Sequence, residues 1–118
     1  MIRPVGEGTL TTPDGRTLDT LPATAEMLPP LRAALGPEVP LLVDGGIRRG
    51  TDVLKALALG ARATLSGRAV LYGLAAGGEQ GVAEVLELLR AELELGLKLL
   101  GCTSPAEVTA AHVRRANL

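Results

Sequence analysis

The sequence contains very few aromatic, cysteine and histidine side chains. Among its 118 residues there are one Tyr, no Phe, no Trp, one Cys and one His. The single Cys102 excludes an intramolecular disulfide framework and a cysteine-based zinc site, and we expect no metal centre. The 12 basic and 13 acidic residues give a net charge of −1, which provides no electrostatic footprint for nucleic acid or an anionic membrane.

Long hydrophobic runs and a targeting segment are also lacking. No apolar stretch approaches the roughly 20 residues that span a bilayer, and Arg3 and Pro4 do not fit a signal peptide. A hydrophobic share of 47% with 21% charged residues is typical of a globular chain. The length suits one small domain and is far below the roughly 250 residues of a complete eight-stranded α/β barrel. These features predict a cytoplasmic protein.

Alternating helix and strand signals begin after residue 23. In residues 1–23, glycines and prolines interrupt every periodic pattern, and three threonines between residues 9 and 12 give only a thin strand signal. The pattern then predicts a helix over 25–35 with Thr24 as N-cap, a strand over 39–43, a helix over 52–59 with Thr51 as N-cap, and a strand over 63–66. We expect Pro29 and Pro30 to divide the first helix. Both strands are expected to be buried.

The C-terminal part of the pattern predicts mostly helix. A short apolar helix over 70–75 leads to a hinge at Gly77 and Gly78, and a long helix over 79–100 follows. Its apolar stripe comprises Val82, Val85, Leu86, Leu89, Leu93, Leu97 and Leu100. Its solvated face is predicted to carry Glu84, Glu87, Glu92 and Glu94. A capping box at residues 104–107, beginning with Ser104, predicts a short final helix.

Two glycine-rich loops each directly follow a predicted strand. The alternation of strands and helices with short connections predicts an α/β fold with parallel strands. The first loop, residues 44–50, reads Asp44-Gly45-Gly46-Ile47-Arg48-Arg49-Gly50, and the second loop, residues 66–68, reads Ser66-Gly67-Arg68.

These loops have the residue types of a phosphate cradle. Glycines allow the backbone to approach a ligand closely, and the amides at the following helix starts favour an anion. Arg48 and Arg68 can hold phosphate oxygens with paired donors. The functional interpretation is a site for a phosphate-bearing cofactor, and the alternative is a pair of ordinary glycine turns with solvated arginines.

The first loop and the helix after it also carry a family resemblance. The stretch over 44–61, DGGIRRGTDVLKALALGA, closely resembles the signature of the FMN-dependent α-hydroxy acid oxidases and dehydrogenases. That family includes glycolate oxidase, lactate oxidase, mandelate dehydrogenase and the flavocytochrome lactate dehydrogenases. Further matching motifs are Gly15-Arg16-Thr17-Leu18-Asp19, Gly67-Arg68, Leu71-Tyr72-Gly73-Leu74-Ala75 and Gly77-Gly78. The resemblance covers about residues 14–115.

The resemblance implies a fold and a cofactor site. The fold is a partial TIM (β/α)8 barrel, comprising the last two to three βα units plus the C-terminal helices. Residues 1–23 are then a degenerate strand and a remodelled active-site loop, and residues 24–118 are the C-terminal βα units of an FMN-dependent barrel. In the family, the loops after the seventh and eighth strands hold the FMN phosphate. Those roles pass to Asp44, Gly45, Gly46, Arg48, Gly67 and Arg68.

The active-site loop departs from the family's pattern. That loop ordinarily reads asparagine-histidine-glycine-glycine-arginine, where the histidine takes the proton of the substrate hydroxyl and the arginine pairs with the substrate carboxylate. Arg16 occupies the arginine position and is the predicted substrate clamp. Pro13 occupies the histidine position and cannot act as a base, and nothing indicates that the neighbouring Asp14 has the raised pKa of a replacement. We therefore predict no catalytic residue in this chain.

Three isolated residues that could carry chemistry are assigned structural roles. His112 is expected on the surface of a C-terminal helix rather than as a replacement base. Cys102 is expected to be a small packing residue rather than a reactive thiol, and Tyr72 to be half-buried.

Two classes of function remain open. The first is the FMN-phosphate-binding portion of an (S)-2-hydroxy acid oxidase or dehydrogenase of the lactate or glycolate type, which acts on a small 2-hydroxy acid only when another chain supplies the rest. The second is a non-catalytic flavin- or phosphate-binding or self-associating module derived from that barrel. A partial barrel leaves strand edges unpaired and exposes Leu42 and Leu65 to water. We therefore expect a homo-oligomer or docking with a complementary chain.

Overall fold

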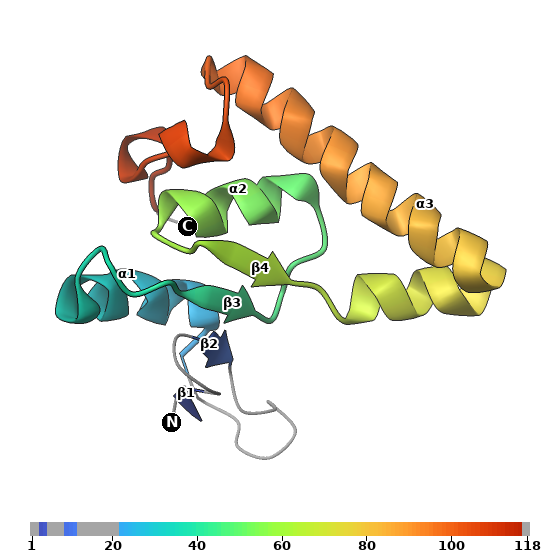
Figure 1. Cartoon of the computed structure of the whole chain (residues 1–118), viewed down its shortest axis with the longest axis horizontal. Coiled ribbons are helices and arrows are strands. Elements are labelled where there is room, and N and C mark those ends of the chain that lie inside the picture. Colours follow the sequence, from blue (N-terminus) through green and yellow to red (C-terminus); the bar gives the residue numbers. More distant parts are fainter. Residues whose placement is uncertain (1–2, 5–8, 12–21, 117–118) are drawn as a thin grey trace.

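Three short parallel strands make up most of the sheet in the computed structural model, which describes residues 3–4, 9–11 and 22–116. The strand order is β1-β2-β3-β4 (Figure 1). The strands are β1 (Arg3–Pro4), β2 (Thr9–Thr11), β3 (Leu42–Asp44) and β4 (Ala63–Leu65). β2, β3 and β4 pair in parallel, and β1 adds an antiparallel pair with β2 that the sequence did not indicate. The predicted α/β arrangement with parallel strands is confirmed over β2 to β4.

α1 and α2 pack against this sheet, and the other helices extend beyond it. They are α1 (Thr24–Leu35), α2 (Gly50–Ala58) and α3 (Arg68–Leu100), followed by the short 3-10 helices η1 (Pro105–Glu107) and η2 (Ala110–His112). Gly77 and Gly78 have non-helical backbone angles and divide α3 into two arms, which confirms the predicted hinge (Figure 1). The arms meet where Gly73 and Gly81 lie backbone to backbone, leaving no space for a Cβ atom at either position.

α1 differs from the prediction in two respects. The helix is continuous through Pro29 and Pro30, so the predicted division is wrong. Both prolines are exposed, and water can therefore solvate the carbonyls that lose an amide partner. Thr24 is the first helical residue and not the N-cap, which is Ala23. The buried Thr24 hydroxyl donates instead to the Asp44 carbonyl at 3.0 Å, which ties the start of α1 to the end of β3.

Two apolar clusters hold these elements together. The first cluster joins α1, the chain around β3 and α2 through Leu28, Leu41, Val43, Ile47, Ala56 and Ala61. The second cluster joins α2 to the long arm of α3 and to the C-terminal segment through Leu54, Ala58, Leu97 and Val108. The side chains of Leu28 and Leu41 are completely or almost completely buried, so the first cluster is the packing centre beneath the end of β3.

Apolar side chains of β4 and α3 are exposed, among them Leu65, which was expected to be exposed to water in a partial barrel. β4 is not buried, because Ala63 and Leu65 are exposed on a strand for which the structure describes pairing only with β3. Leu65 is 45% exposed, and Tyr72 on the first arm of α3 is 70% exposed, so the expectation of a half-buried Tyr72 is wrong. On the predicted apolar stripe of the long arm, Leu86 remains 52% exposed. No described element packs over this face of β4 and the first arm.

Of the two N-caps predicted after the first helix, Thr51 is wrong, and Ser104 lies at the N-cap position of η1 without a side-chain cap hydrogen bond. α2 begins at Gly50 with Arg49 as N-cap, so Thr51 lies inside the helix. At the C-terminal end, Ser104 makes no side-chain cap, and the predicted helix is replaced by two 3-10 turns. Glu107 accepts hydrogen bonds from the amide and hydroxyl of Thr103 at 2.8 and 2.6 Å, which lower the pKa of its carboxyl. At both helix starts, carboxylates rather than the predicted hydroxyls accept the backbone amides of the preceding residues.

Candidate functional site

The two glycine-rich loops lie side by side at one edge of the sheet. β3 and β4 are parallel neighbours, and their carboxyl ends therefore meet at this edge. The Ser66 hydroxyl of the second loop donates to the Ile47 carbonyl of the first loop at 3.1 Å. This direct hydrogen bond fixes the spacing of the loops across the ends of the two strands.

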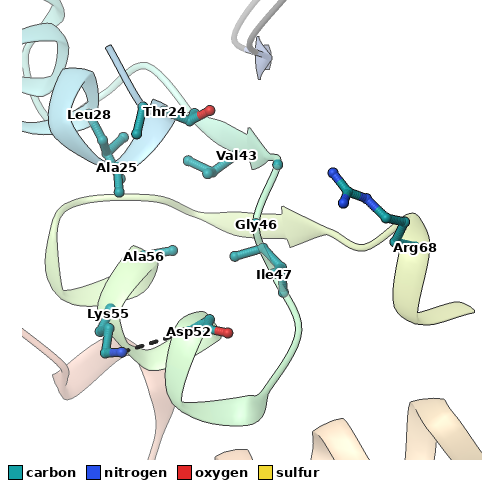
Figure 2. Close-up of a pocket in the computed structure, with 12 residues that line it drawn as sticks. Thr24, Ala25, Leu28, Val43, Gly46, Ile47, Asp52, Lys55, Ala56 and Arg68 are labelled. Atoms are coloured by element: carbon teal, nitrogen blue, oxygen red, sulfur yellow. Dashed lines mark hydrogen bonds and ion pairs between the residues drawn. The ribbon is translucent and has the colours of Figure 1, made fainter. Parts of the chain in front are cut away.

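A hollow of about 370 Å³ opens at these strand ends. Gly45, Gly46 and Ile47 of the first loop line it together with Arg68 of the second loop, and the starts of α1 and α2 complete its wall (Figure 2). The structure therefore brings Gly45, Gly46 and Arg68 together at one cavity. Arg48 is exposed and lies outside the described lining of this cavity.

The backbone of the first loop requires glycine. Gly45 and Gly46 have φ angles of 100° and 77°, a region that side chains with a Cβ atom rarely adopt. A Cβ atom at Gly46 would have no neighbour within 4 Å, so the backbone angle and not lack of space makes glycine necessary there. The Gly45 amide donates to Asp44 Oδ1 at 2.8 Å, which assigns Asp44 to shaping the loop.

The start of α2 is occupied by carboxylates of the chain itself. The amides of Arg48 and Arg49 donate to Asp52 Oδ2 at 3.2 and 3.0 Å, and the amide of Gly50 donates to Glu92 Oε2 at 2.8 Å. The expectation that these amides are open to an external anion is therefore wrong. An internal carboxylate already uses the positive end of the α2 dipole.

The start of α3 is different. In the described part of the chain, the amides of Arg68, Ala69 and Val70 donate to no side chain and to no carbonyl that precedes the helix. The first amide that does so is that of Leu71, which donates to the Gly67 carbonyl at 3.0 Å. Free amides at a helix start attract an anion. The start of α3 therefore offers such amides next to Arg68, which lines the cavity.

The predicted substrate and catalytic positions cannot be located. Arg16, Pro13 and Asp14 lie outside the residues that the structure describes. The assignment of Arg16 to a substrate carboxylate, and the absence of a catalytic residue, therefore stay predictions.

Cys102 and His112 are neighbours in the structure. The Cys102 sulfur lies 3.8 Å from His112 Nε2, and His112 Nδ1 accepts the Thr109 amide at 3.0 Å. Cys102 also packs on the second apolar cluster. This geometry fits the predicted packing role of Cys102, and it leaves His112 partly covered rather than fully on the surface.

Glu92 is the residue that the sequence reasoning missed. It was expected on the solvated face of the long helix, yet it is half-buried and binds both Arg49 and the Gly50 amide. These hydrogen bonds, first from Arg49 and then from Gly50, hold the pKa of the Glu92 carboxyl below its usual value. The helical spacing contained the signal, because Glu92 lies at the edge of the apolar stripe, next to Val85 on the helix surface.

Two further properties of the described residues bear on the kind of site. No group of three or more His, Cys, Asp and Glu side chains in these residues is arranged to hold a metal ion. None of the helices in this part of the chain has both the length and the apolar character needed to cross a membrane.

Known proteins match most of the length of this chain. The model of the FMN-dependent dehydrogenase family matches residues 11–115. A peroxisomal (S)-2-hydroxy-acid oxidase from Oryza sativa subsp. japonica is 56% identical over 98 residues, which are 83% of this chain and 27% of that protein. A 2-hydroxyacid oxidase from Dictyostelium discoideum is 52% identical over 94 residues, 80% of this chain and 24% of that protein.

Solved structures show the same relationship. A soluble mutant of the membrane-associated (S)-mandelate dehydrogenase from Pseudomonas putida matches with a TM-score of 0.86 and 44% identity, over 93% of this chain and 31% of that one. A flavocytochrome b2 with sulfite bound matches with a TM-score of 0.81 and 42% identity, over 87% and 28%. These neighbours are FMN-dependent TIM-barrel enzymes, and this chain spans about a quarter to a third of their length. The chain belongs to the FMN-dependent dehydrogenase family.

Proposed function

We propose that this chain is the C-terminal, FMN-phosphate-binding portion of an FMN-dependent (S)-2-hydroxy acid oxidase or dehydrogenase of the lactate or glycolate type. The observation that carries the proposal is the convergence of the two loops, linked by the Ser66–Ile47 hydrogen bond, on one cavity that Arg68 also lines. FMN is the cofactor of the family to which the chain belongs.

The donors at the cavity fit a phosphate dianion. Arg68 supplies a guanidinium, the start of α3 supplies free amides, and the exposed Gly46 and Gly67 allow the backbone to approach phosphate oxygens closely. Arg48 is exposed on the first loop outside the described lining, and it is the second cation that we propose for the phosphate. Asp52 also lines the cavity, but its carboxylate is satisfied by two backbone amides and by Lys55 at 3.5 Å.

The role of this chain in the reaction is to bind and orient. Bound FMN supplies the ring that accepts a hydride from the substrate. The residues at the cavity would hold the phosphate end of FMN, and their role would be to position the cofactor. We therefore propose that the chain alone does not oxidise a 2-hydroxy acid. Arg16 binds a substrate carboxylate only when another chain supplies the rest of the barrel.

We also propose that the fold is the last two to three βα units of a TIM barrel. A second protein chain, here called the second body, would complete the barrel. The exposed β4 edge, Leu65 and Tyr72 support this, together with relatives whose matched segment is only 24–28% of their length. The second body is either another copy of this chain, most simply in a symmetric dimer, or a separate chain with the remaining strands. Cytoplasmic localisation also stays a proposal.

A flavin-fluorescence titration tests the cofactor site. We expect the full chain to bind FMN and the Arg68→Gln protein to bind it about tenfold more weakly or worse, because a charge-assisted hydrogen bond to phosphate is lost. Arg62→Gln is the matched control, since Arg62 is exposed and precedes β4 at the opposite end of that strand. An equal loss of FMN affinity in both variants, or no binding of FMN by the unmodified chain, would contradict the proposal.

An anaerobic experiment tests the proposed lack of activity. Lactate and glycolate are added in turn to the FMN-loaded chain, and the flavin absorbance is followed. We expect no bleaching with either acid. Bleaching would show that the chain reduces its flavin without a complementary chain.

The alternative function is a non-catalytic, self-associating module. The apolar face on β4 and the first arm of α3 favours it, because Leu65, Leu71, Tyr72 and Leu74 are 45–70% exposed. Sedimentation at micromolar concentration together with the FMN titration separates the two. Association without any FMN binding would favour the module, and FMN binding sensitive to Arg68 would favour the cofactor-binding portion.

A further inference from the structure

The long arm of α3 is hydrogen-bonded to the start of α2 through the carboxylate of Glu92. Arg49 donates from Nη2 to Glu92 Oε1 at 2.7 Å and from Nε to the same oxygen at 3.2 Å. The other oxygen, Oε2, accepts the Gly50 amide at 2.8 Å. Both oxygens of Glu92 are therefore engaged with the last two residues of the first loop, which are 42–43 positions away in sequence.

The backbones are also in direct contact at this point. A Cβ atom at Gly50 would lie 2.5 Å from Glu92 Cβ, 2.5 Å from the Leu93 nitrogen and 2.7 Å from the Glu92 carbonyl carbon. No side chain separates the two helices there, so small movements of α3 are transmitted directly to the end of the first loop. We name Arg49, Gly50 and Glu92 the loop clamp.

The loop clamp also assigns different tasks to two adjacent arginines. The Arg49 guanidinium is neutralised by Glu92. No ion pair or side-chain hydrogen bond of Arg48 is found among the described residues. Of this pair, Arg48 is therefore the cation available to an anion, and Arg49 holds the loop.

We propose that Glu92 and Arg49 are positioning residues of the phosphate site: they fix the C-terminal end of the first loop so that Gly46 and Arg48 face the phosphate. This inference rests on the proposed function. It goes beyond that function because it assigns a role in the cofactor site to a residue of the C-terminal helix that lies outside the described cavity lining.

The chain contains a matched control on the same helix. Among the described residues, Glu94 pairs only with Arg90 of its own helix, as does Glu87. Glu94→Ala therefore removes a carboxylate and an ion pair from the long arm without touching the first loop. Glu92→Gln keeps an oxygen that can accept the Gly50 amide and removes the charge that holds Arg49.

The first experiment needs no cofactor. Amide hydrogen exchange over residues 45–50 is compared in the unmodified chain, Glu92→Ala, Glu92→Gln and Glu94→Ala. We expect Glu92→Ala to speed exchange in this segment by about tenfold, Glu92→Gln to restore most of the protection, and Glu94→Ala to have no effect. Unchanged protection in Glu92→Ala, or equal loss in Glu94→Ala, would overturn the proposal.

The second experiment measures FMN affinity in the same proteins, with circular dichroism confirming that each is folded. We expect Glu92→Ala to weaken binding about tenfold, as removal of a supporting group does, with substantial rescue by Glu92→Gln. Equal affinity in Glu92→Ala and the unmodified chain would overturn the positioning role. If Glu92→Ala does not fold, Arg49→Gln, which leaves the Gly50–Glu92 bond in place, is judged by the same two criteria. If the unmodified chain fails to bind FMN, the proposed function falls, and the exchange result alone decides whether the clamp holds the loop.

Discussion

Replacing Gly50 with alanine tests the contact between α2 and α3. The added methyl group would lie 2.5–2.7 Å from Glu92 Cβ, the Leu93 nitrogen and the Glu92 carbonyl carbon. Ordinary carbon contacts are about 3.5–4.0 Å, so one helix must move by about 1 Å. Two of the three neighbours are backbone atoms, which cannot rotate away. We therefore expect a cost near the upper end of the range of about 1–3 kcal/mol that overpacking usually has.

Thermal unfolding followed by circular dichroism measures this cost. For a domain of this size, about 2–3 kcal/mol corresponds to a Tm lower by about 10 °C or more. Gly77→Ala is the control, since a Cβ atom there would have no neighbour within 4 Å and its φ angle is negative. A fall of less than about 2 °C for Gly50→Ala, or an equal fall for Gly77→Ala, would refute the close packing that we describe.

Three further variants test the core, the first loop and the ion pair. Leu28→Ala should cost about 2–5 kcal/mol in denaturant unfolding because the side chain is completely buried, whereas Leu35→Ala, on the same helix and 47% exposed, should cost far less. Gly46→Ala should cost about 1–2 kcal/mol through its positive φ alone, and a neutral result in the same assay would contradict the described loop backbone. Because the folded-state pKa of Glu92 is lowered, its stabilisation is present above the ordinary glutamate pKa of about 4.3 and is lost as the pH falls through the lower folded value. The Tm difference between the unmodified chain and Glu92→Gln should therefore shrink below about pH 4, and a constant difference would oppose this reasoning.

Features that depend on local chemistry were predictable from the sequence. The break in the C-terminal helix follows from Gly77 and Gly78, and the end of α1 follows from Gly36, whose φ angle is 75°. The parallel pairing of β3 and β4 follows from short connections through α2. The position of both loops at one edge of the sheet could therefore be predicted from the sequence alone.

Features that depend on distant partners were not predictable in the same way. Thr24 and Thr51 have the residue type of N-caps, but Thr24 bonds to the end of β3 and the start of α2 uses the carboxylates of Asp52 and Glu92. A carboxylate attracts backbone amides more strongly than a hydroxyl does, and only the fold shows that Glu92 is near. The same contact explains why the start of α2 is closed to an external anion while the start of α3 is open.

Comparing FMN with riboflavin tests the central claim most directly, because the two ligands differ only in the phosphate. Isothermal titration of the full chain with each ligand gives their affinities under identical conditions. If the two loops hold the phosphate, FMN should bind about tenfold or more tightly than riboflavin, and inorganic phosphate should compete with FMN. Equal affinities for FMN and riboflavin would contradict the account.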